Sequence, residues 1–436
     1  MSAPRVELSP EILATARRLG QAAQQAARPL ASLSSEQKNA ALSTLASLLT
    51  DSTQVQAVLA ANARDLEAGA QAGLSAALLD RLRLDAGRLR GLAQAVRDII
   101  ALPDPVGEIV ETWQRPRGFT VQRTRIPLGV LLLIYEARPN VTIDAAALAL
   151  KSGNAVILRG GKEALHSNLA LAALLRQALA ATGLPADACQ FVDNPDRALL
   201  LALLQQNGLI DLCIPRGGEA LIRFVVEHAR VPVVQHYQGV CHLFVDDSAD
   251  LSMAVELIEN GKCSRPAVCN ALECLLIHQA VAATLLPALA TRLATHGVEL
   301  RLEADAQALL PSPLPTGLGV QAAEPADFGR EFLDLTLAVR IVPSLDAAIE
   351  HIARFGSLHT EVIVTRDAAH AQRFAREVCA SFVGWNVSTR FNDGGELGLG
   401  AEVGISTSKL HAFGPMGLRE LCTTKFVVTG SGQVRT

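Results

Sequence analysis

The chain has 436 residues, of which 50% are hydrophobic, 19% are charged and only 4% are aromatic. This composition allows a large buried core, and the length is enough for two or three domains. The formal net charge is −4 and no run of about eighteen apolar residues occurs, which excludes a strongly basic nucleic-acid-binding protein and a membrane-spanning one.

Eight cysteines are spread along the chain without a CxxC pair or a tight Cys/His cluster. In a chain of this length such spacing is typical of a reduced, cytosolic protein and not of a disulfide or zinc framework. The first twenty residues include Glu7 and Glu11 and have no apolar centre, so we expect no signal peptide. We therefore expect a cytoplasmic protein with no metal site.

The first hundred residues predict a group of helices. Ser9-Pro10-Glu11 is a helix start, with serine as the cap and proline in the first turn, and Ser35 opens a second helix. Pro103 and Pro105 end this helical region.

Residues 106–129 predict a β-hairpin. Two alternating stretches, EIVETW and FTVQRTRI, flank Arg115-Pro116-Arg117-Gly118. A ribbon of this size has too little core to be stable alone. It is either an edge hairpin of the main domain or an arm that pairs with another subunit, and the pattern leaves both alternatives open.

Strands and helices alternate from Gly129 to about residue 237. The expected strands are GVLLLIYEA, AVILRGG, CQFVD, LIDLCIP and VPVVQHY, with a helical segment between each pair. This alternation predicts an α/β domain built on an open parallel sheet with helices on both faces.

A second α/β unit begins after about Gly239. A stretch rich in proline and glycine, residues 310–320, interrupts it before the strands LAVRIV and TEVIVT and the helix AAHAQRFAREV. The glycine-rich tail from Phe382 ends in the strand KFVVTG.

Two strand ends of the first unit carry an arginine followed by glycines. They are Arg159-Gly160-Gly161-Lys162 and Arg216-Gly217-Gly218, and no GxGxxG motif is present. Such glycines let a ligand approach the backbone, and the next helix N-terminus favours phosphate. Each motif alone is weak, but their recurrence in one sheet makes a dinucleotide site as well supported as two ordinary turns.

Cys269 lies between a basic turn and the apolar run that begins at Leu272. We expect Lys262 and Arg265 to favour its thiolate, which is the reactive form and would suit covalent catalysis. The alternative is a small buried hydrophobic side chain. On these residues alone, Cys263 and Cys274 remain competing nucleophiles.

Several segments in order resemble the gamma-glutamyl phosphate reductase family, also called glutamate-5-semialdehyde dehydrogenase, a divergent branch of the aldehyde dehydrogenase superfamily. The resemblance extends over nearly the whole chain. The segments are IYEARPN at 134–140, LRGGK at 158–162, IPRGG at 214–218, RPAVCNA at 265–271, HTE at 359–361, NVSTRF at 386–391 and GAEVGIST at 400–407.

The resemblance implies NADPH-dependent reduction of L-glutamyl 5-phosphate to L-glutamate 5-semialdehyde, with release of phosphate, in proline synthesis. It implies that Cys269 is the nucleophile and forms a thioester. It also implies that the Asn140 amide and the backbone N–H of Cys269 stabilise the oxyanion, where one donor contributes roughly 3–4 kcal/mol.

The resemblance also implies an aldehyde dehydrogenase-like domain plan. Residues 1–108, 130–240 and 385–406 would form a Rossmann-like cofactor domain, residues 241–384 the catalytic domain, and residues 109–129 and 407–436 a β oligomerisation arm. In relatives the arm and tail strands join across subunits, so we expect a homo-oligomer. The chain starts with the reductase helices, so glutamate 5-kinase is expected as a separate protein and a candidate partner.

Departures from the superfamily pattern carry information. Oxidising relatives have a glutamate base in a Glu-Leu-Gly-Gly motif, whereas this chain has His236-Tyr237-Gln238-Gly239, which argues against the alternative of an oxidising aldehyde dehydrogenase. Lys162 stands where NAD-dependent relatives have a glutamate, so it suits a 2′-phosphate unless it is simply a solvated lysine. Phe413 replaces an arginine common in relatives, and its role is in doubt.

Candidate substrate-binding residues are cationic or hydroxylated. Arg265 is either a turn residue or a cation for the leaving phosphate. Arg138 and Ser388-Thr389-Arg390 are candidates for the α-carboxylate, because arginine binds carboxylates in a bidentate way, although structural pairing would explain them equally. For His359 and Glu361 a hydrogen-bonded turn is the favoured reading.

Overall fold

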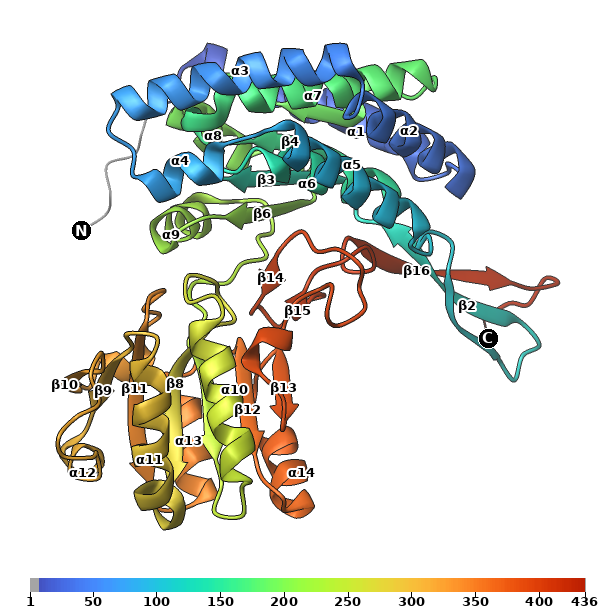
Figure 1. The fold of residues 1–436 in the computed structure, drawn as a ribbon. Coiled ribbons are helices and arrows are strands. Elements are labelled where there is room, and N and C mark those ends of the chain that lie inside the picture. The colour runs from blue at the N-terminus through green and yellow to red at the C-terminus, as the bar shows by residue number, and fades with distance from the viewer. Residues whose placement is uncertain (1–7, 436) are drawn as a thin grey trace.

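The computed structural model describes residues 8–435 and consists of two α/β domains and a β arm (Figure 1). The first seven residues of the expected cofactor domain and the last residue of the expected arm lie outside the described residues. No helix within residues 8–435 is long and apolar enough to cross a bilayer.

The N-terminal region is helical, as predicted. Ser9 caps the first helix, but Ser34 and not Ser35 caps the second, where it forms a capping box with Gln37. The helices are α1 (Pro10–Leu30), α2 (Ser35–Leu48), α3 (Ser52–Gln71), α4 (Ala76–Leu82) and α5 (Ala86–Ala101).

The first domain contains a parallel sheet in the order β5-β4-β3-β6, which confirms the predicted fold class. Helices α6 and α7 pack with α2, α3 and α5, whereas α8 packs with α1. Right-handed crossovers place these two groups on opposite faces of the sheet. The bounds are β3 (Val130–Tyr135), α6 (Asn140–Lys151), β4 (Ala155–Arg159), η1 (Lys162–Ala164), α7 (Leu165–Ala181), η2 (Ala186–Ala188), β5 (Cys189–Phe191), α8 (Arg197–Leu204), β6 (Leu212–Arg216) and α9 (Glu219–His228).

The expected strand VPVVQHY does not form. Only an isolated bridge joins Val233 to Cys213 in this stretch. Pro232 has no N–H to give to a ladder, and its carbonyl oxygen accepts a single bond from the Cys213 N–H at 2.8 Å. The stretch therefore lies beside β6 without extending the sheet.

The second domain contains a seven-stranded parallel sheet in the order β10-β9-β11-β8-β7-β12-β13. Its residues alternate between two cores: Leu243 and Val245 pack with α10 and α11, and Phe244 packs with α13 and α14. The bounds are β7 (Cys241–Val245), α10 (Leu251–Cys263), β8 (Leu272–His278), α11 (Gln279–Ala294), β9 (Glu299–Leu302), α12 (Ala304–Gln307), β10 (Gly319–Ala322), η3 (Asp327–Gly329), β11 (Thr336–Val342), α13 (Leu345–Phe355), β12 (Thr360–Val364), α14 (Ala368–Glu377) and β13 (Phe382–Trp385).

The arm is a three-stranded antiparallel sheet, β1-β2-β16, that extends away from both domains (Figure 1). The predicted hairpin consists of β1 (Ile109–Gln114) and β2 (Thr120–Pro127), and the predicted tail strand is β16 (Cys422–Thr429). The hairpin therefore projects from the body of the same chain and pairs with its own tail strand.

The segment between β13 and β16 connects the two domains and holds η4 (Thr389–Phe391), β14 (Ile405–Ser406) and β15 (Gly414–Pro415). Its start packs on the catalytic domain, because the Asn270 side chain donates to the carbonyl oxygens of Arg390 and Asn392. Further on, Met416 and Leu421 belong to the core of the cofactor domain. The arm thus begins near Cys422 and not at residue 407.

Candidate active site

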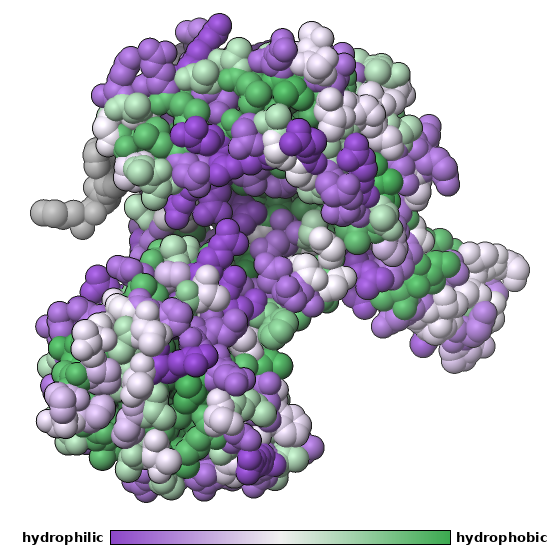
Figure 2. Space-filling view, viewed as in Figure 1, coloured by the Kyte–Doolittle hydropathy of each residue, from purple (hydrophilic) through white to green (hydrophobic). Residues whose placement is uncertain are grey.

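Cys269 lies in the turn between α10 and β8. The surface of the molecule is hollowed between the two domains (Figure 2). The segment before β7 packs directly against Cys269. A Cβ on Gly239 would lie 2.1 Å from the Cys269 carbonyl oxygen, so only glycine fits there. That oxygen also accepts a hydrogen bond from Cys241 Sγ at 3.2 Å, and the nucleophile's backbone is thereby fixed.

The electrostatic surroundings of Cys269 differ from the sequence expectation. Burial, followed by the carboxylates of Glu402 and Glu331, raises the pKa of the Cys269 thiol to about 11, and Arg216 opposes this rise. The expectation that Lys262 would favour the thiolate is wrong, because its Nζ lies 2.6 Å from the Glu273 carboxylate and both side chains are fully buried. Arg216, which opposes the rise, belongs to the other domain.

A hydrogen-bonded network supports the turn that contains Cys269. The Asn270 side chain donates to the Asn392 carbonyl oxygen at 2.9 Å, and the Asn392 side chain donates to Thr360 Oγ1 at 2.8 Å. His359 Nδ1 lies 2.7 Å from the same hydroxyl and 3.7 Å from Cys241 Sγ. Burial lowers the pKa of His359 to about 3, so it is neutral. The favoured structural reading of His359 is confirmed.

Three arginines interact electrostatically with Cys269: Arg138 and Arg216 of the first domain, and Arg390 of the segment after β13. Burial and then the neighbouring cations, including Arg216 and Arg265, lower the pKa of Arg138. Burial and then Arg265 lower the pKa of Arg390, and the charges of both Arg138 and Arg390 interact with Cys269. So many cations beside one thiol form a site for an anion with more than one negative charge.

The two hydroxyl candidates next to Arg390 do not reach the hollow. Ser388 Oγ donates to Asn260 Oδ1 at 2.6 Å and accepts from the Arg390 N–H. Thr389 is fully buried, with its hydroxyl against Gly261 of α10. These two side chains hold η4 on α10, and only Arg390 of the predicted trio interacts electrostatically with the thiol.

Asn140 is the first residue of α6, and its side chain is exposed. Its Nδ2 donates one hydrogen to Asp144 Oδ2 at 3.1 Å, which leaves the second amide hydrogen free for another acceptor. Burial raises the pKa of Asp144 to about 6, while the bond from Asn140 and the charge of Arg216 oppose the rise. Asp144 therefore orients the predicted oxyanion donor.

A pocket of about 580 Å³ lies at the carboxyl ends of β3, β4 and β6, and its volume is typical of cofactor sites. Arg159, Gly161 and Lys162 line it, as predicted from their strand end. Arg159 donates to the Pro195 carbonyl oxygen at 2.8 Å, and Lys162 is exposed. Two cations in a pocket of this size fit a phosphorylated dinucleotide, although Glu163 lies close to Gly161.

Of the remaining predicted glycines, Gly160 and Gly217 are required by packing, whereas a Cβ on Gly218 would meet no atom within 4 Å. A Cβ on Gly160 would meet Asn168 Nδ2 at 2.2 Å, and one on Gly217 would meet the Glu136 side chain at 2.6 Å. The Gly218 N–H donates to Glu136 Oε2 at 3.1 Å. The start of α9 thus already has a carboxylate partner, which departs from the expectation that it receives a phosphate.

Three residues near Cys269 were missing from the sequence-based set. Arg216 belongs to a motif whose glycines alone were selected, and Glu402 belongs to the GAEVGIST segment. Glu331 lies in a loop without a recognisable pattern, and its carboxylate accepts from the Gly239 N–H. The chain therefore has carboxylates near the thiol although its His236–Gly239 stretch has none.

The pocket lies on the first α/β domain, and Cys269 lies in the second. The sequence model of the aldehyde dehydrogenase family matches residues 13–308. Gamma-glutamyl phosphate reductase of Anaeromyxobacter sp. (strain Fw109-5) is 57% identical over 431 residues, which are 99% of this chain and 100% of that protein. The enzyme of the same name from Nitratidesulfovibrio vulgaris (strain Hildenborough) is 56% identical over 419 residues, 96% and 98% of the two chains.

The chain belongs to the gamma-glutamyl phosphate reductase family and is an oxidoreductase. The crystal structure of gamma-glutamyl phosphate reductase from Thermotoga maritima has a TM-score of 0.92 and 41% identity, covering 97% of this chain and 100% of that one. An acetylating aldehyde dehydrogenase from Geobacillus thermoglucosidasius shares the fold at a TM-score of 0.69 and 16% identity, with 98% of both chains covered. The predicted family and fold are confirmed.

Proposed function

We propose that this chain reduces L-glutamyl 5-phosphate to L-glutamate 5-semialdehyde with release of phosphate, as a step of proline biosynthesis. The names of its relatives support this reaction. The observation that carries it is a group of arginines at Cys269: Arg138, Arg216 and Arg390 interact with Cys269, and Arg265 interacts with Arg138 and Arg390. A substrate with a phosphate and an α-carboxylate supplies the anions that such a set requires, whereas a simple aldehyde does not.

Cys269 Sγ attacks the acyl carbon of the substrate, and the bond from that carbon to the phosphate oxygen breaks. The thiol proton passes to the departing phosphate, which leaves as hydrogen phosphate, and an acyl thioester remains. Asn140 Nδ2 and the Cys269 backbone N–H donate to the oxyanion that develops on attack. Because burial keeps the free thiol protonated at neutral pH, reactivity should rise with pH.

NADPH, when bound, supplies the hydride that converts the thioester to a thiohemiacetal, whose collapse releases the aldehyde and the Cys269 sulfur. Arg159, Gly161 and Lys162 would hold it in the pocket beside β4. The ammonium of Lys162 suits a 2′-phosphate, which favours NADPH over NADH. An engineered glycolyl-CoA reductase with the same fold was solved with bound NADP+.

The test is the reverse reaction, followed as reduction of NADP+ by glutamate semialdehyde with and without inorganic phosphate. Phosphate should be required, because it takes the acyl group from the Cys269 thioester. Glu331 and Glu402 near the thiol favour one competing function, an oxidising aldehyde dehydrogenase that hydrolyses its thioester. Equal rates without phosphate would establish that alternative.

We also propose that the arm joins two copies of the chain. Phe426 and Val428 of β16 are 67% and 58% exposed, and such an apolar edge strand is an aggregation hazard unless it is paired. Deleting residues 112–120 should convert an oligomer into monomers or aggregates in a sedimentation experiment. A wild-type chain that sediments as a stable monomer at micromolar concentration would refute this proposal.

A reducing compartment, the cytoplasm, suits this chemistry. All eight cysteines are free, and the nucleophile must remain a thiol to react.

A further inference from the structure

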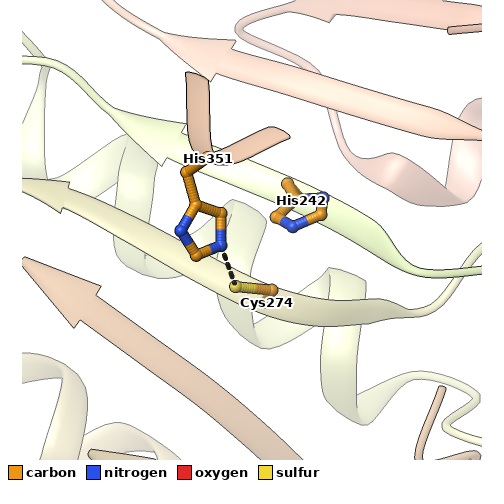
Figure 3. A group of neighbouring side chains, drawn as sticks. All are labelled: His242, Cys274 and His351. Atoms are coloured by element: carbon orange, nitrogen blue, oxygen red, sulfur yellow. Dashed lines mark hydrogen bonds between the residues drawn. The ribbon is translucent and has the colours of Figure 1, made fainter. Parts of the chain in front are cut away.

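A row of three ionisable side chains crosses the catalytic-domain sheet. Glu361 of β12 is paired with His242 of β7, and His242 is paired with Cys274 of β8. Paired residues of neighbouring strands point to the same face of a sheet. Helix α13 covers that face and places His351 over the row, so that His242, Cys274 and His351 converge (Figure 3).

The converging atoms have the spacing of metal ligands. The ligand atoms of His242, Cys274 and His351 all lie within 4.8 Å of one another, and Cys274 Sγ lies 3.7 Å from His351 Nε2. Around a tetrahedral zinc ion, with Zn–S of about 2.3 Å and Zn–N of about 2.0–2.1 Å, sulfur and nitrogen ligands lie about 3.5 Å apart. The observed pair needs only a small adjustment.

The outer contacts of His242 fit a metal ligand as well. Its Nδ1 lies 2.9 Å from Glu361 Oε2, and a carboxylate on one ring nitrogen commonly orients the other toward a metal. Neither ring nitrogen of His242 makes a hydrogen bond of good geometry within the described residues, although His242 is 0% exposed. A buried nitrogen without a partner is costly, and a bound ion would satisfy it.

Charge and surroundings agree with a buried ion. A divalent cation bound by the Cys274 thiolate, beside an ionised Glu361, would be neutral overall, which lowers the cost of burying it. Phe328 and Phe355 pack around the His351 ring, with ring centroids 5.5 Å and 4.7 Å away, and shield the cluster from water.

Two features compete with metal binding. Although burial opposes it, the Glu361 carboxylate and Cys274 raise the pKa of His242 to about 10, so a metal must displace a ring proton from His242. The other feature is a hydrogen bond to His351. Arg340 Nη1 donates to His351 Nδ1 at 3.1 Å, which places the remaining ring proton on Nε2, toward Cys274. A metal on Nε2 requires that proton on Nδ1, so the Arg340 contact must break. Arg340 also lies 3.3 Å from Glu303 and can keep that partner.

We propose that His242, Cys274 and His351 form a binding site for Zn2+, with Glu361 as the outer carboxylate, separate from the nucleophile Cys269. The proposal departs from the expectation of no metal site, which rested on spacing along the chain. Strands β7 and β8 adjoin the segments that hold Cys269, so an ion there would tie together the strands beneath the nucleophile.

The direct test is the zinc content of the full chain, purified without chelator from zinc-supplemented medium. Wild type and Cys269→Ala should hold stoichiometric zinc, and Cys274→Ser should hold almost none. Cys263→Ser is the matched control, because this cysteine flanks the nucleophile without joining the cluster. Zinc lost with Cys269→Ala and kept by a folded Cys274→Ser, or absent from wild type, would overturn the proposal.

A second variant keeps the test decisive if Cys274→Ser fails to fold. Arg340→Gln replaces the competing donor by a carbonyl oxygen that can accept from His351 Nδ1–H. This variant should retain zinc at a roughly tenfold higher chelator concentration than wild type. Cobalt(II) should also give thiolate charge-transfer absorption in wild type and Cys269→Ala. Unchanged chelator resistance together with no such absorption would refute the site.

Discussion

The two sheets of this molecule place their charged groups differently. In the cofactor domain, Arg159, Lys162 and Arg216 lie at or beyond the strand ends, where a ligand can reach them. In the catalytic domain, His242 and Glu361 lie within strands and are completely buried. The first arrangement leaves its charges accessible to a ligand, whereas the second can act only through the segments that its strands hold. The burial of the charged side chains in each sheet therefore indicates whether they are able to contact a ligand directly.

The strongest test of this comparison is to remove the thiol of Cys269, which lies in a turn next to the catalytic-domain sheet. Cys269→Ala should abolish turnover, because in the proposed reaction this thiol forms the thioester with the substrate. NADPH binding should survive, since the pocket belongs to the other sheet. The measurement is the steady-state rate together with fluorescence titration of NADPH. Residual activity comparable to that of Cys263→Ala would exclude Cys269 as the nucleophile.

Removing the oxyanion donor should have the next largest effect. Asn140→Ala should lower kcat by about 10²–10³ with little change in KM, because the oxyanion exists only after attack. Asp144→Asn, which keeps a side-chain oxygen to accept from the Asn140 amide, should cost much less. An effect confined to KM would show instead that Asn140 binds the ground-state substrate.

The next prediction concerns the preference for NADPH over NADH. Lys162→Glu should lower the NADPH/NADH ratio of kcat/KM by roughly 10- to 100-fold, since a bond to a charged group contributes about 1.5–3 kcal/mol. The NADPH/NADH ratio of Lys162→Ala should lie between the ratios of Lys162→Glu and the wild type. If both variants keep the wild-type ratio, Lys162 does not contact the cofactor.

The smallest expected effect is a change in the pKa of the Cys269 thiol. Glu331 raises the pKa of Cys269, so Glu331→Gln should lower it and increase the thiolate fraction at any pH below about 11. Alkylation of Cys269 by iodoacetamide at pH 8 should quicken by less than about tenfold, which is one pKa unit. The glutamine oxygen can still accept from Gly239. A slower reaction would mean that Glu331 helps to deprotonate the thiol.

Local patterns were enough to predict most of the fold. Alternation and strand ends identified both parallel sheets, the hairpin and the tail strand, because these depend on periodicity and on residues close in sequence. The stretch VPVVQHY was wrongly predicted to be a strand. Its hydrophobic pattern suits a strand, but Pro232 prevents a hydrogen-bonded ladder.

The electrostatics of the site could not be predicted in the same way. Lys262 is close in sequence to the turn that holds Cys269, yet its charge is neutralised by the buried ion pair with Glu273. Arg216 from the other domain interacts with the thiol instead. The buried cluster of His242, Cys274 and His351 is likewise assembled from segments about 30 to 110 residues apart, a separation that no spacing rule detects.

The pairing of β2 with β16 has a consequence for biosynthesis. The bond from Arg123 to Thr424 joins residues 301 positions apart, with both domains in between. The ribosome therefore exposes the hairpin long before it makes the strand that covers its edge, and the hairpin must wait unpaired while the domains fold. We expect nascent chains that end before β16 to remain unassembled, which pull-down of ribosome-bound chains with a tagged full-length copy would measure.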